Sequence, residues 1–237
     1  MKEIYFIFDE TNINNFIQML WCAIVEDDSF FDLLIKYQKN AYLKPQFWNL
    51  KNSFPHYTED WHNQRTIILE EYRMLPYKSY FYIDEYKNQR SNFKEIYEQS
   101  LNNLIKPQII KYIKKYWKKN IKLIFLFENL SSETNLFFEN IIDKWIHWIE
   151  KEIKMISKSD YNWATSLIDY NCWILSEYLK DANNEKPNSY WRSVYNSIVS
   201  KIWLIIYKTE EKTDFYHFKT QRSSFETKYH WKFAKVS

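Results

Sequence analysis

The chain of 237 residues carries 33 Lys and Arg against 30 Asp and Glu, and the net charge of +3 is too small to identify a binding partner. No apolar run approaches the roughly 18–20 residues that span a bilayer, and the acidic N-terminus lacks the pattern of a signal peptide. Two cysteines, Cys22 and Cys172, are too few for a disulfide framework, so a reducing, cytoplasmic setting is expected.

Glycine is absent from the chain, although average usage near 7% predicts roughly 17 residues. The abundance of Lys, Asn, Ile, Tyr and Phe is typical of an AT-rich coding sequence, a bias that lowers glycine but rarely abolishes it. Deliberate removal of glycine and translation under a wrong code are two explanations. Without glycine, positive-φ positions are expected to fall to Asn or Asp. A Gly-rich phosphate loop is excluded, which argues against P-loop and Rossmann nucleotide binding.

The first half of the chain begins with two predicted strands. The apolar run Ile4–Phe8 is β-branched and aromatic, reads as a buried strand, and ends in the carboxylates of Asp9 and Glu10. A second strand is expected over 16–25, with the Asn-rich segment 12–15 as the hairpin turn. Helices follow at about 29–40 and 64–74, with a mixed segment between them that contains two prolines.

The second half alternates strands and helices. A strand over 79–83 ends in Asp84 and Glu85, and a strand over 121–127 runs into Glu128. The other predicted elements are a helical stretch at 91–118 that Pro107 kinks or breaks, a helix at 131–151, a short strand at 153–156, and helices at 161–181 and 189–207. Residues 208–237 show no clear period, and their aromatic side chains suit further strands or ordinary packing.

This order predicts an α/β fold with a mixed, mostly parallel sheet flanked by helices. We expect a single domain over residues 1–207, with a helical insertion at about 28–76 and a C-terminal extension at 208–237.

Three predicted strands end in acidic residues, and one more acid lies on a helix. In α/β sheets the ligand crevice lies at the carboxyl ends of the strands. Asp169 borders the apolar stripe of the helix 161–181, so it is expected to face the sheet or its rim. Two divalent ions held by such carboxylates align an in-line displacement at phosphorus. The alternative is that each acid simply begins a turn or a helix. The candidate ligands of Mg²⁺ or Mn²⁺ are Asp9, Glu10, Asp84, Glu128 and Asp169.

Two short segments resemble the DUF3800 proteins. Tyr5–Asn12 (YFIFDETN) resembles their "DESG" opening, and Ala164–Tyr170 (ATSLIDY) resembles their C-terminal "GLQLADY" segment, with Ser157–Ser159 preceding it much as in that family. The order of elements matches over about residues 3–205. That family is similar to ribonuclease H-like folds, so the resemblance implies such a fold, a carboxylate–metal site and nuclease activity. It carries over to Asp9, Glu10 and Asp169 as catalytic residues.

The chain departs from that family's pattern at four positions. Asn12 and Ala164 replace motif glycines, Ser166 stands where glutamine is usual, and Trp21 occupies a strand position that is commonly small. These replacements put the turn geometry after Glu10 in doubt, while the acids themselves are retained.

A lysine-rich segment at 106–122 is the second candidate site. Lys111, Lys114, Lys115 and Lys118 share one face of the expected helix, and Ile110, Ile113 and Trp117 share another. A basic face of this kind holds phosphates in a salt-dependent way; the alternative is a solvated outer face.

The sequence therefore supports a divalent-metal-dependent nuclease or other phosphodiesterase, with the four lysines guiding a nucleic-acid backbone. One alternative is a non-catalytic module that binds nucleic acid or a protein. Another is a glycine-free engineered variant with no tested activity.

Overall fold

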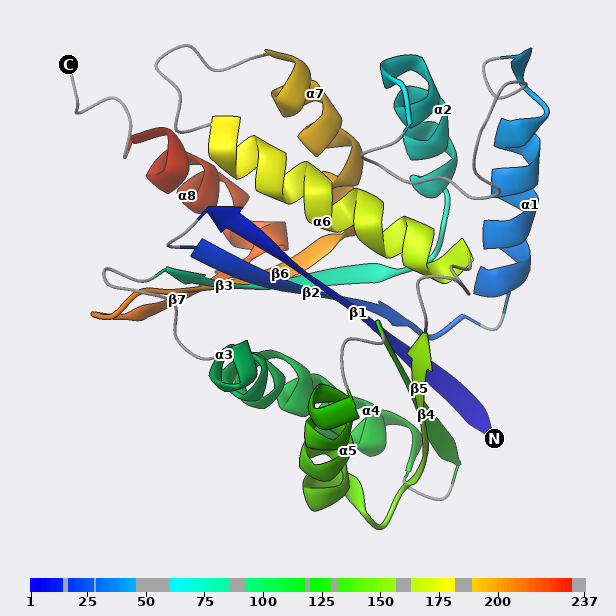
Figure 1. The fold of residues 1–237 in the computed structure, drawn as a ribbon, viewed down its shortest axis with the longest axis vertical. Coiled ribbons are helices and arrows are strands. Elements are labelled where there is room, and N and C mark those ends of the chain that lie inside the picture. Colours follow the sequence, from blue (N-terminus) through cyan, green and yellow to red (C-terminus); the bar gives the residue numbers. More distant parts are fainter. Residues whose placement is uncertain are drawn as a thin grey trace.

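A computed structural model describes residues 1–14, 17–27, 29–45, 60–85, 93–117, 120–128, 132–156, 163–181 and 189–231. These residues form a seven-stranded sheet in the order β5-β4-β1-β2-β3-β6-β7 (Figure 1). The strands are β1 (Lys2–Asn14), β2 (Ile17–Val25), β3 (Lys78–Glu85), β4 (Ile121–Glu128), β5 (Glu150–Ile156), β6 (Ile202–Lys208) and β7 (Thr213–His217).

The sheet is mixed, and five of its seven strands run in the same direction. β1, β2 and β3 pair antiparallel in sequence, while β4 pairs parallel to β1 and β5 parallel to β4. The strands β3, β2, β1, β4 and β5 form a continuous run of neighbours in the sheet. β6 extends it, parallel to β3, and β7 closes the edge antiparallel to β6. The predicted fold class is confirmed.

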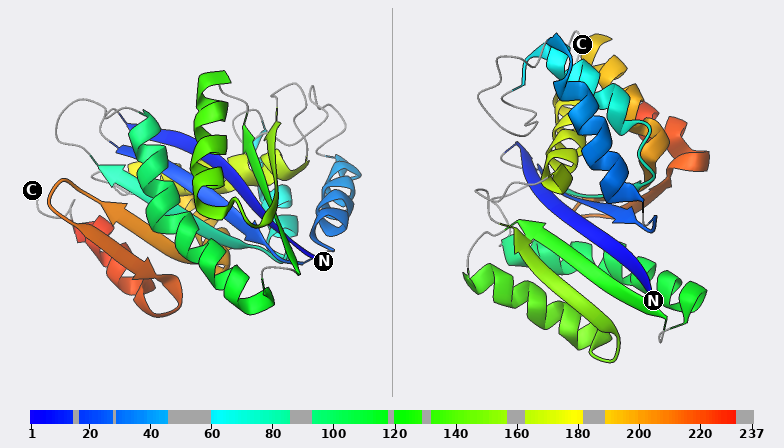
Figure 2. Two further views of the ribbon diagram at one scale, coloured as in Figure 1. Left: turned by 90° about the horizontal axis from the view of Figure 1, so that it is seen from below. Right: turned by 90° about the vertical axis from the view of Figure 1, so that its right-hand side faces the viewer.

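Helices cover both faces of the sheet (Figures 1 and 2). One layer contains α1 (Phe30–Tyr42), α2 (His62–Tyr72), α6 (Trp163–Asp181), α7 (Ser189–Ile198) and α8 (Phe218–Trp231). The opposite layer contains α3 (Phe93–Ser100), a π-helical turn (Leu101–Ile105), α4 (Lys106–Tyr116) and α5 (Ser132–Ile146). None of the helices in these ranges combines the length and apolar character that a bilayer span requires.

Strand alternation divides the apolar residues between two cores, because successive side chains point to opposite faces. Ile7, Trp21 and Phe81 belong to the core under α6. Phe6, Phe8 and Tyr82 belong to the core under α3, α4 and α5. Whether a strand residue has the odd or the even position in the alternation (its parity) therefore determines which layer of helices its side chain contacts.

The last predicted helix, at 189–207, is wrong in its second half. The helix α7 ends at Ile198, a 3₁₀ turn covers Val199–Lys201, and Ile202–Lys208 is the strand β6. The segment IWLIIY is rich in β-branched and aromatic residues, which fit a pleated surface between two strands better than a helix. The predicted helix at 131–151 is also too long, since α5 ends at Ile146 and β5 begins at Glu150.

The C-terminal residues join the same sheet. β7 pairs with β6, and α8 places the buried rings of Phe218 and Phe225 in the core on the α6 side. The predicted division into a domain over 1–207 and an extension stays a prediction.

A tryptophan, rather than the expected asparagine or aspartate, has a positive φ angle. In the part of the chain that the structure describes, Trp117 has a φ of 61° and a ψ of 136°, at the end of α4. An Asn or Asp was expected at such a position, and a bulky residue there costs about 1–3 kcal/mol. The turn that it starts returns the chain to β4, and the Asn120 amide donates to the Trp117 carbonyl at 3.0 Å.

Glu26 follows β2 directly, and hydrogen bonds to its carboxylate link the end of that strand to β3 and α4. Its carboxylate accepts hydrogen bonds from Lys78 at 2.8 Å, Lys115 at 2.5 Å and the Tyr116 hydroxyl at 3.0 Å. Burial acts to raise the pKa of Glu26, but these donors outweigh it and lower the pKa to about 2. The folded state therefore favours the charged carboxylate.

We expect Glu26→Gln to lower the free energy of unfolding by about 1–2 kcal/mol at neutral pH, since charge-assisted hydrogen bonds are lost. The folded-state pKa is depressed, so this stability is present above the usual value of 4.5 and is lost as the pH falls toward 2. Urea unfolding of wild type and variant should therefore converge at acid pH. Glu70→Gln, at an exposed site on α2, is the control. A constant difference across the pH range would contradict the assignment.

Candidate active site

The two carboxylates that follow the first apolar run lie on opposite faces of the sheet. β1 does not end at Glu10, as expected, but continues to Asn14, and Asp9 and Glu10 pair with Trp21 and Leu20 of β2. Asp9 shares the parity of Ile7 and lies on the α6 face. Glu10 shares the parity of Phe8 and lies on the α3 face.

Asp169 lies on the same face as Asp9. The helix α6 makes its most extensive contacts with β1, and Asp169 is 7% exposed. Cys172 lies three residues after Asp169 on α6, and burial raises the pKa of its thiol, as do the negative charges of Asp9, Asp169 and Glu10. Asp9 of β1 and Asp169 of α6 belong to the same layer, and together they form the candidate acidic site.

Glu10 has a different environment. The Tyr97 hydroxyl, from α3, donates a short hydrogen bond to Glu10 Oε2. Tyr97 is itself buried and packs edge-on against Phe138 of α5, with ring centroids 4.5 Å apart. This hydrogen bond holds Glu10 in the layer away from Asp169.

Asp84 is also held on the α3 side. It is 2% exposed, and Lys208 Nζ lies 3.2 Å from Asp84 Oδ2. Lys208 also donates to Gln99 of α3. Gln18 of β2 pairs with Asn12 of β1 on one side and with Asp84 of β3 on the other. The backbone of Asp84 is therefore two strands, roughly 10 Å, across the sheet from β1, and three residues, roughly 10 Å, further along the strand direction than Asp9. The neighbouring Glu85 accepts a hydrogen bond from the Tyr207 hydroxyl.

Glu128 is the candidate nearest to Asp9 in the strand register. The paired residues Ile7 and Leu126 are each followed two positions later by Asp9 and Glu128. The paired register between β1 and β4 ends at Ile7 and Leu126, so strand pairing does not fix the distance between Asp9 and Glu128. The Glu128 side chain lies outside the described residues.

A hard divalent cation fits this site in part. Asp9 and Asp169 offer carboxylate oxygens, which Mg²⁺ and Mn²⁺ prefer. In the ranges that the structure describes, no three His, Cys, Asp or Glu side chains form a metal-binding group. Convergence of all five predicted acids on one pair of ions stays a prediction, and the geometry places Glu10 and Asp84 on the other face.

A buried polar network that the sequence did not reveal fixes α6. The Tyr170 hydroxyl donates to Asp60, and the Tyr72 hydroxyl bonds to Ser166 Oγ at 2.8 Å and accepts from Gln38 at 2.6 Å. Burial raises the pKa of Tyr170, and the Asp60 charge raises it further, so the hydroxyl stays a donor. Tyr170 and Ser166 flank Asp169, so the network sets the rotation of the helix that carries it.

Two of the motif departures have clear packing roles. Ser166 takes part in the network above, and Trp21 lies directly opposite Asp9 in β2, fully buried. Asn12 lies within β1, before a register shift, rather than in a turn. Ser157–Ser159 lie outside the described residues, as does the Ala164 side chain.

The predicted nucleic-acid face lies at the far end of the sheet from Asp9. Lys115 forms an ion pair with Glu26, the residue that follows β2. Because Tyr5 pairs with Val25, Glu26 lies beside Ile4. Ile4 is five residues, or roughly 17 Å, from Asp9 along β1. Lys111 Nζ lies 5.5 Å from the Trp203 ring centroid, at the start of β6.

Of the three apolar residues predicted to share a face of this helix, Ile113 packs partly against the core on the α3 side. Ile110 is 44% and Trp117 78% exposed, and the buried residues of α4 are Ile109 and Tyr112. Lys114 is exposed, and Lys118 lies outside the described residues.

No protein-family model matches the chain, and no curated protein matches it. Among solved structures, the crystal structure of a mutant protein of Bst-RNase HIII is similar, with 12% sequence identity and a TM-score of 0.32. The match covers 100% of this chain and 71% of that chain. At this TM-score the likeness supports no inference, and the fold assignment rests on the strand order instead.

Proposed function

We propose that the chain is a divalent-metal-dependent phosphodiesterase of the nuclease type, with its site on the α6 face of β1. The observation that carries the proposal is that the buried Asp169 lies on α6, the helix that packs against β1 on the face that carries Asp9. Two carboxylates in the same layer can supply oxygen ligands to one hard divalent cation. The resemblance to DUF3800 proteins at both segments is consistent with this proposal.

In this proposal Asp9 and Asp169, with Glu128 at the end of β4, hold Mg²⁺ or Mn²⁺. When bound, such an ion generates a hydroxide from water and stabilises the leaving oxygen of a phosphodiester. The role of the protein is to hold carboxylates in place, which β1 does through its central position in the sheet and α6 through the Asp60–Tyr170 contact. The Cys172 thiol, buried and with a raised pKa, stays protonated and is no nucleophile.

Glu10 has a separate role in this proposal, because Tyr97 binds it on the other face. It anchors α3 to β1 and so stabilises the layer behind the site. Lys111, Lys114 and Lys115 are proposed as contacts for a nucleic-acid backbone, at the far end of the sheet from the acids.

Millimolar Mn²⁺ should raise the melting temperature of the wild-type protein and leave that of Asp9→Asn nearly unchanged. Binding to the folded state stabilises by about 2.7 kcal/mol at a hundred times the Kd, and each kcal/mol raises the melting temperature of a chain this size by about 2–4 °C. Differential scanning fluorimetry measures the shift. Asp32→Asn, at an exposed site in the first turn of α1, should behave as wild type. Equal shifts in all three proteins would contradict the site.

A non-catalytic binding module is the second candidate. The contacts that hold Glu10 and Asp84 favour it, since both acids have protein partners on the α3 side. A protein that gains stability with Mn²⁺ but cleaves neither DNA nor RNA would support the module over the enzyme.

A further inference from the structure

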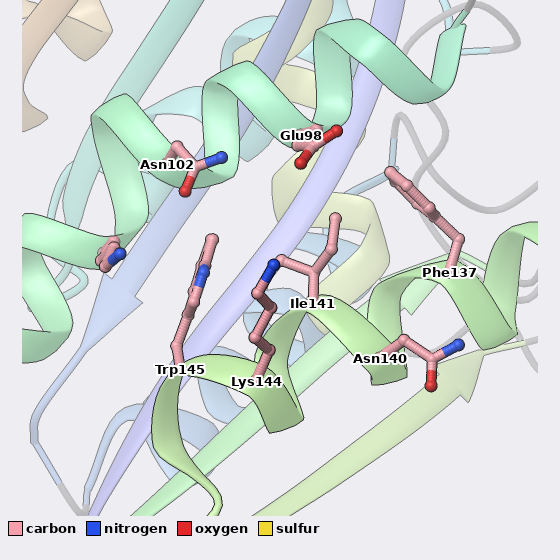
Figure 3. Close-up of a pocket in the computed structure, with 8 residues that line it drawn as sticks. Glu98, Asn102, Phe137, Asn140, Ile141, Lys144 and Trp145 are labelled. Atoms are coloured by element: carbon pink, nitrogen blue, oxygen red, sulfur yellow. The ribbon is translucent and has the colours of Figure 1, made fainter.

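A groove of about 570 Å³ opens between the α3 side of the molecule and α5, on the face away from Asp169 (Figure 3). Its walls are the helical stretch from α3 through the π-helical turn to α4, and the length of α5. The volume is in the range of small-molecule sites, about 300–1,000 Å³. The lining residues are Glu98, Asn102, Lys106, Phe137, Asn140, Ile141, Lys144 and Trp145.

The floor of the groove is apolar and half-buried. Phe137, Ile141 and Trp145 recur every four residues on α5, so they form one stripe along the helix. All three pack against the core on this side of the sheet while keeping part of their surface open. Such a stripe offers a flat aromatic ligand both a ring to stack on and apolar surface to cover.

The opposite wall presents polar groups. Figure 3 shows Glu98 and Asn102 directed from their helix toward Trp145 and Lys144. Asn102 lies in the π-helical turn, which immediately precedes α4 with Pro107 in its first turn. Pro107 has no N–H to complete the usual helical bond, which leaves the preceding turn free to widen. π-helical turns occur frequently at functional sites.

The charges of the groove have no ionic partners in the described part of the chain. Glu98, Lys106 and Lys144 all line it, and none of them forms an ion pair there. Lys106 Nζ lies 5.4 Å from the Trp145 ring centroid, where the ring quadrupole attracts a cation. Two cations beside one carboxylate leave the groove with a net positive charge and therefore favour an anionic ligand.

We propose that this groove binds a planar heteroaromatic ring that carries an anionic group, the chemistry of a nucleoside monophosphate. The ring lies along the Trp145 and Phe137 stripe, and the phosphate meets Lys106 and Lys144. The amides of Asn102 and Asn140, with the Glu98 carboxylate, supply the donors and acceptors that a nucleobase edge requires. Surfaces that combine positive charge with aromatic side chains on which bases stack recur where proteins bind single-stranded nucleic acids.

This site is independent of the proposed catalytic function. The sheet separates the two sites, since the groove lies in the α3–α5 layer, whereas Asp9 and Asp169 lie on the α6 side (Figure 1). Two sources offer the same chemistry: a free nucleotide and the phosphorylated end of a nucleic-acid strand. The size of the groove admits one nucleotide unit in either case.

Isothermal titration calorimetry of the full chain against AMP and UMP, without added metal, tests the proposal. We expect one of the two nucleotides to bind, the matching nucleoside to bind at least tenfold more weakly, and inorganic phosphate not to bind measurably. A 5′-phosphorylated dinucleotide that binds more tightly than the mononucleotide would identify a strand end as the ligand, and equal or weaker binding would identify the free nucleotide.

The variant Lys106→Gln/Lys144→Gln should weaken nucleotide binding at least tenfold, because both lysines are exposed and contribute charge rather than packing. Lys36→Gln/Lys39→Gln, also exposed but on α1 in the opposite layer, is the matched control and should bind as wild type. Trp145→Phe keeps a ring and should retain binding. No binding of AMP or UMP at millimolar concentration, or equal loss in the control, would overturn the proposal, whether or not the protein cleaves nucleic acid.

Discussion

Replacing Asp169 by asparagine should abolish Mn²⁺-dependent cleavage of nucleic acid. Asparagine keeps the size of the side chain but removes the negative charge that a divalent ion requires, so a loss of about 100-fold or more is expected, about 2.7 kcal/mol in the barrier. The apo fold should be as stable as wild type or slightly more stable, since one of two neighbouring negative charges is gone. Cleavage of single- and double-stranded DNA and RNA with Mn²⁺, and urea unfolding without it, measure the two effects.

Asp181 provides the matched control, because it lies at the other end of α6 and is also 7% exposed. Asp181→Asn should change stability but not cleavage. If Asp169→Asn keeps full activity, or if both variants lose it equally, the acidic site of β1 and α6 is not catalytic. Asp9→Asn should match Asp169→Asn in both measurements.

The central part of the fold could be predicted from local sequence pattern. The run Ile4–Phe8 and the segments at 79–83 and 121–127 became β1, β3 and β4, because short β-branched and aromatic runs between turn signals have few alternatives. The stripe of Leu167, Tyr170 and Ile174 became the buried side of α6. The strand order itself follows from long-range pairing, which a pattern within one segment does not specify.

The prediction of a helix over the second half of 189–207 was wrong because that segment is a strand with both faces buried. Leu204 and Ile206 pack in the core on the α3 side, Ile205 and Tyr207 pack in the core on the α6 side, and β6 lies between β3 and β7. A strand with both faces covered loses the alternation of polar and apolar residues that identifies a half-buried strand. An apolar run of that kind also reads as a continuation of the preceding helix.

The five candidate acids stay a prediction as metal ligands, and the structure bears on how they are grouped. Asp9 and Glu10 are adjacent in sequence, and if β1 ended there, both would sit in one turn. Because β1 continues to Asn14, the pleat sends them to different layers. Tyr97, which binds Glu10, lies far away along the chain, and nothing in the sequence indicates this contact.

The largest stability effect is expected from Lys208→Met, which removes the cation beside Asp84. The carboxylate is 2% exposed and lies 3.2 Å from Lys208 Nζ, so the variant leaves a buried charge without that cation. Removing one member of a buried pair typically costs about 3–5 kcal/mol. The double variant Lys208→Met/Asp84→Asn should recover about half of that loss, because the buried charge is gone as well. Urea unfolding at neutral pH measures the cycle.

An exposed ion pair of the same length serves as the control for this cycle. Lys212 Nζ also lies 3.2 Å from its partner, Asp214, but the lysine side chain is 61% exposed, so Lys212→Met should change stability by less than about 0.5 kcal/mol. If Lys208→Met behaves like Lys212→Met, Asp84 is not a structural anion and is free to serve as a ligand. If it costs several kcal/mol and Asp84→Asn leaves Mn²⁺ binding unchanged, Asp84 belongs to the fold, and the metal site is confined to the α6 face.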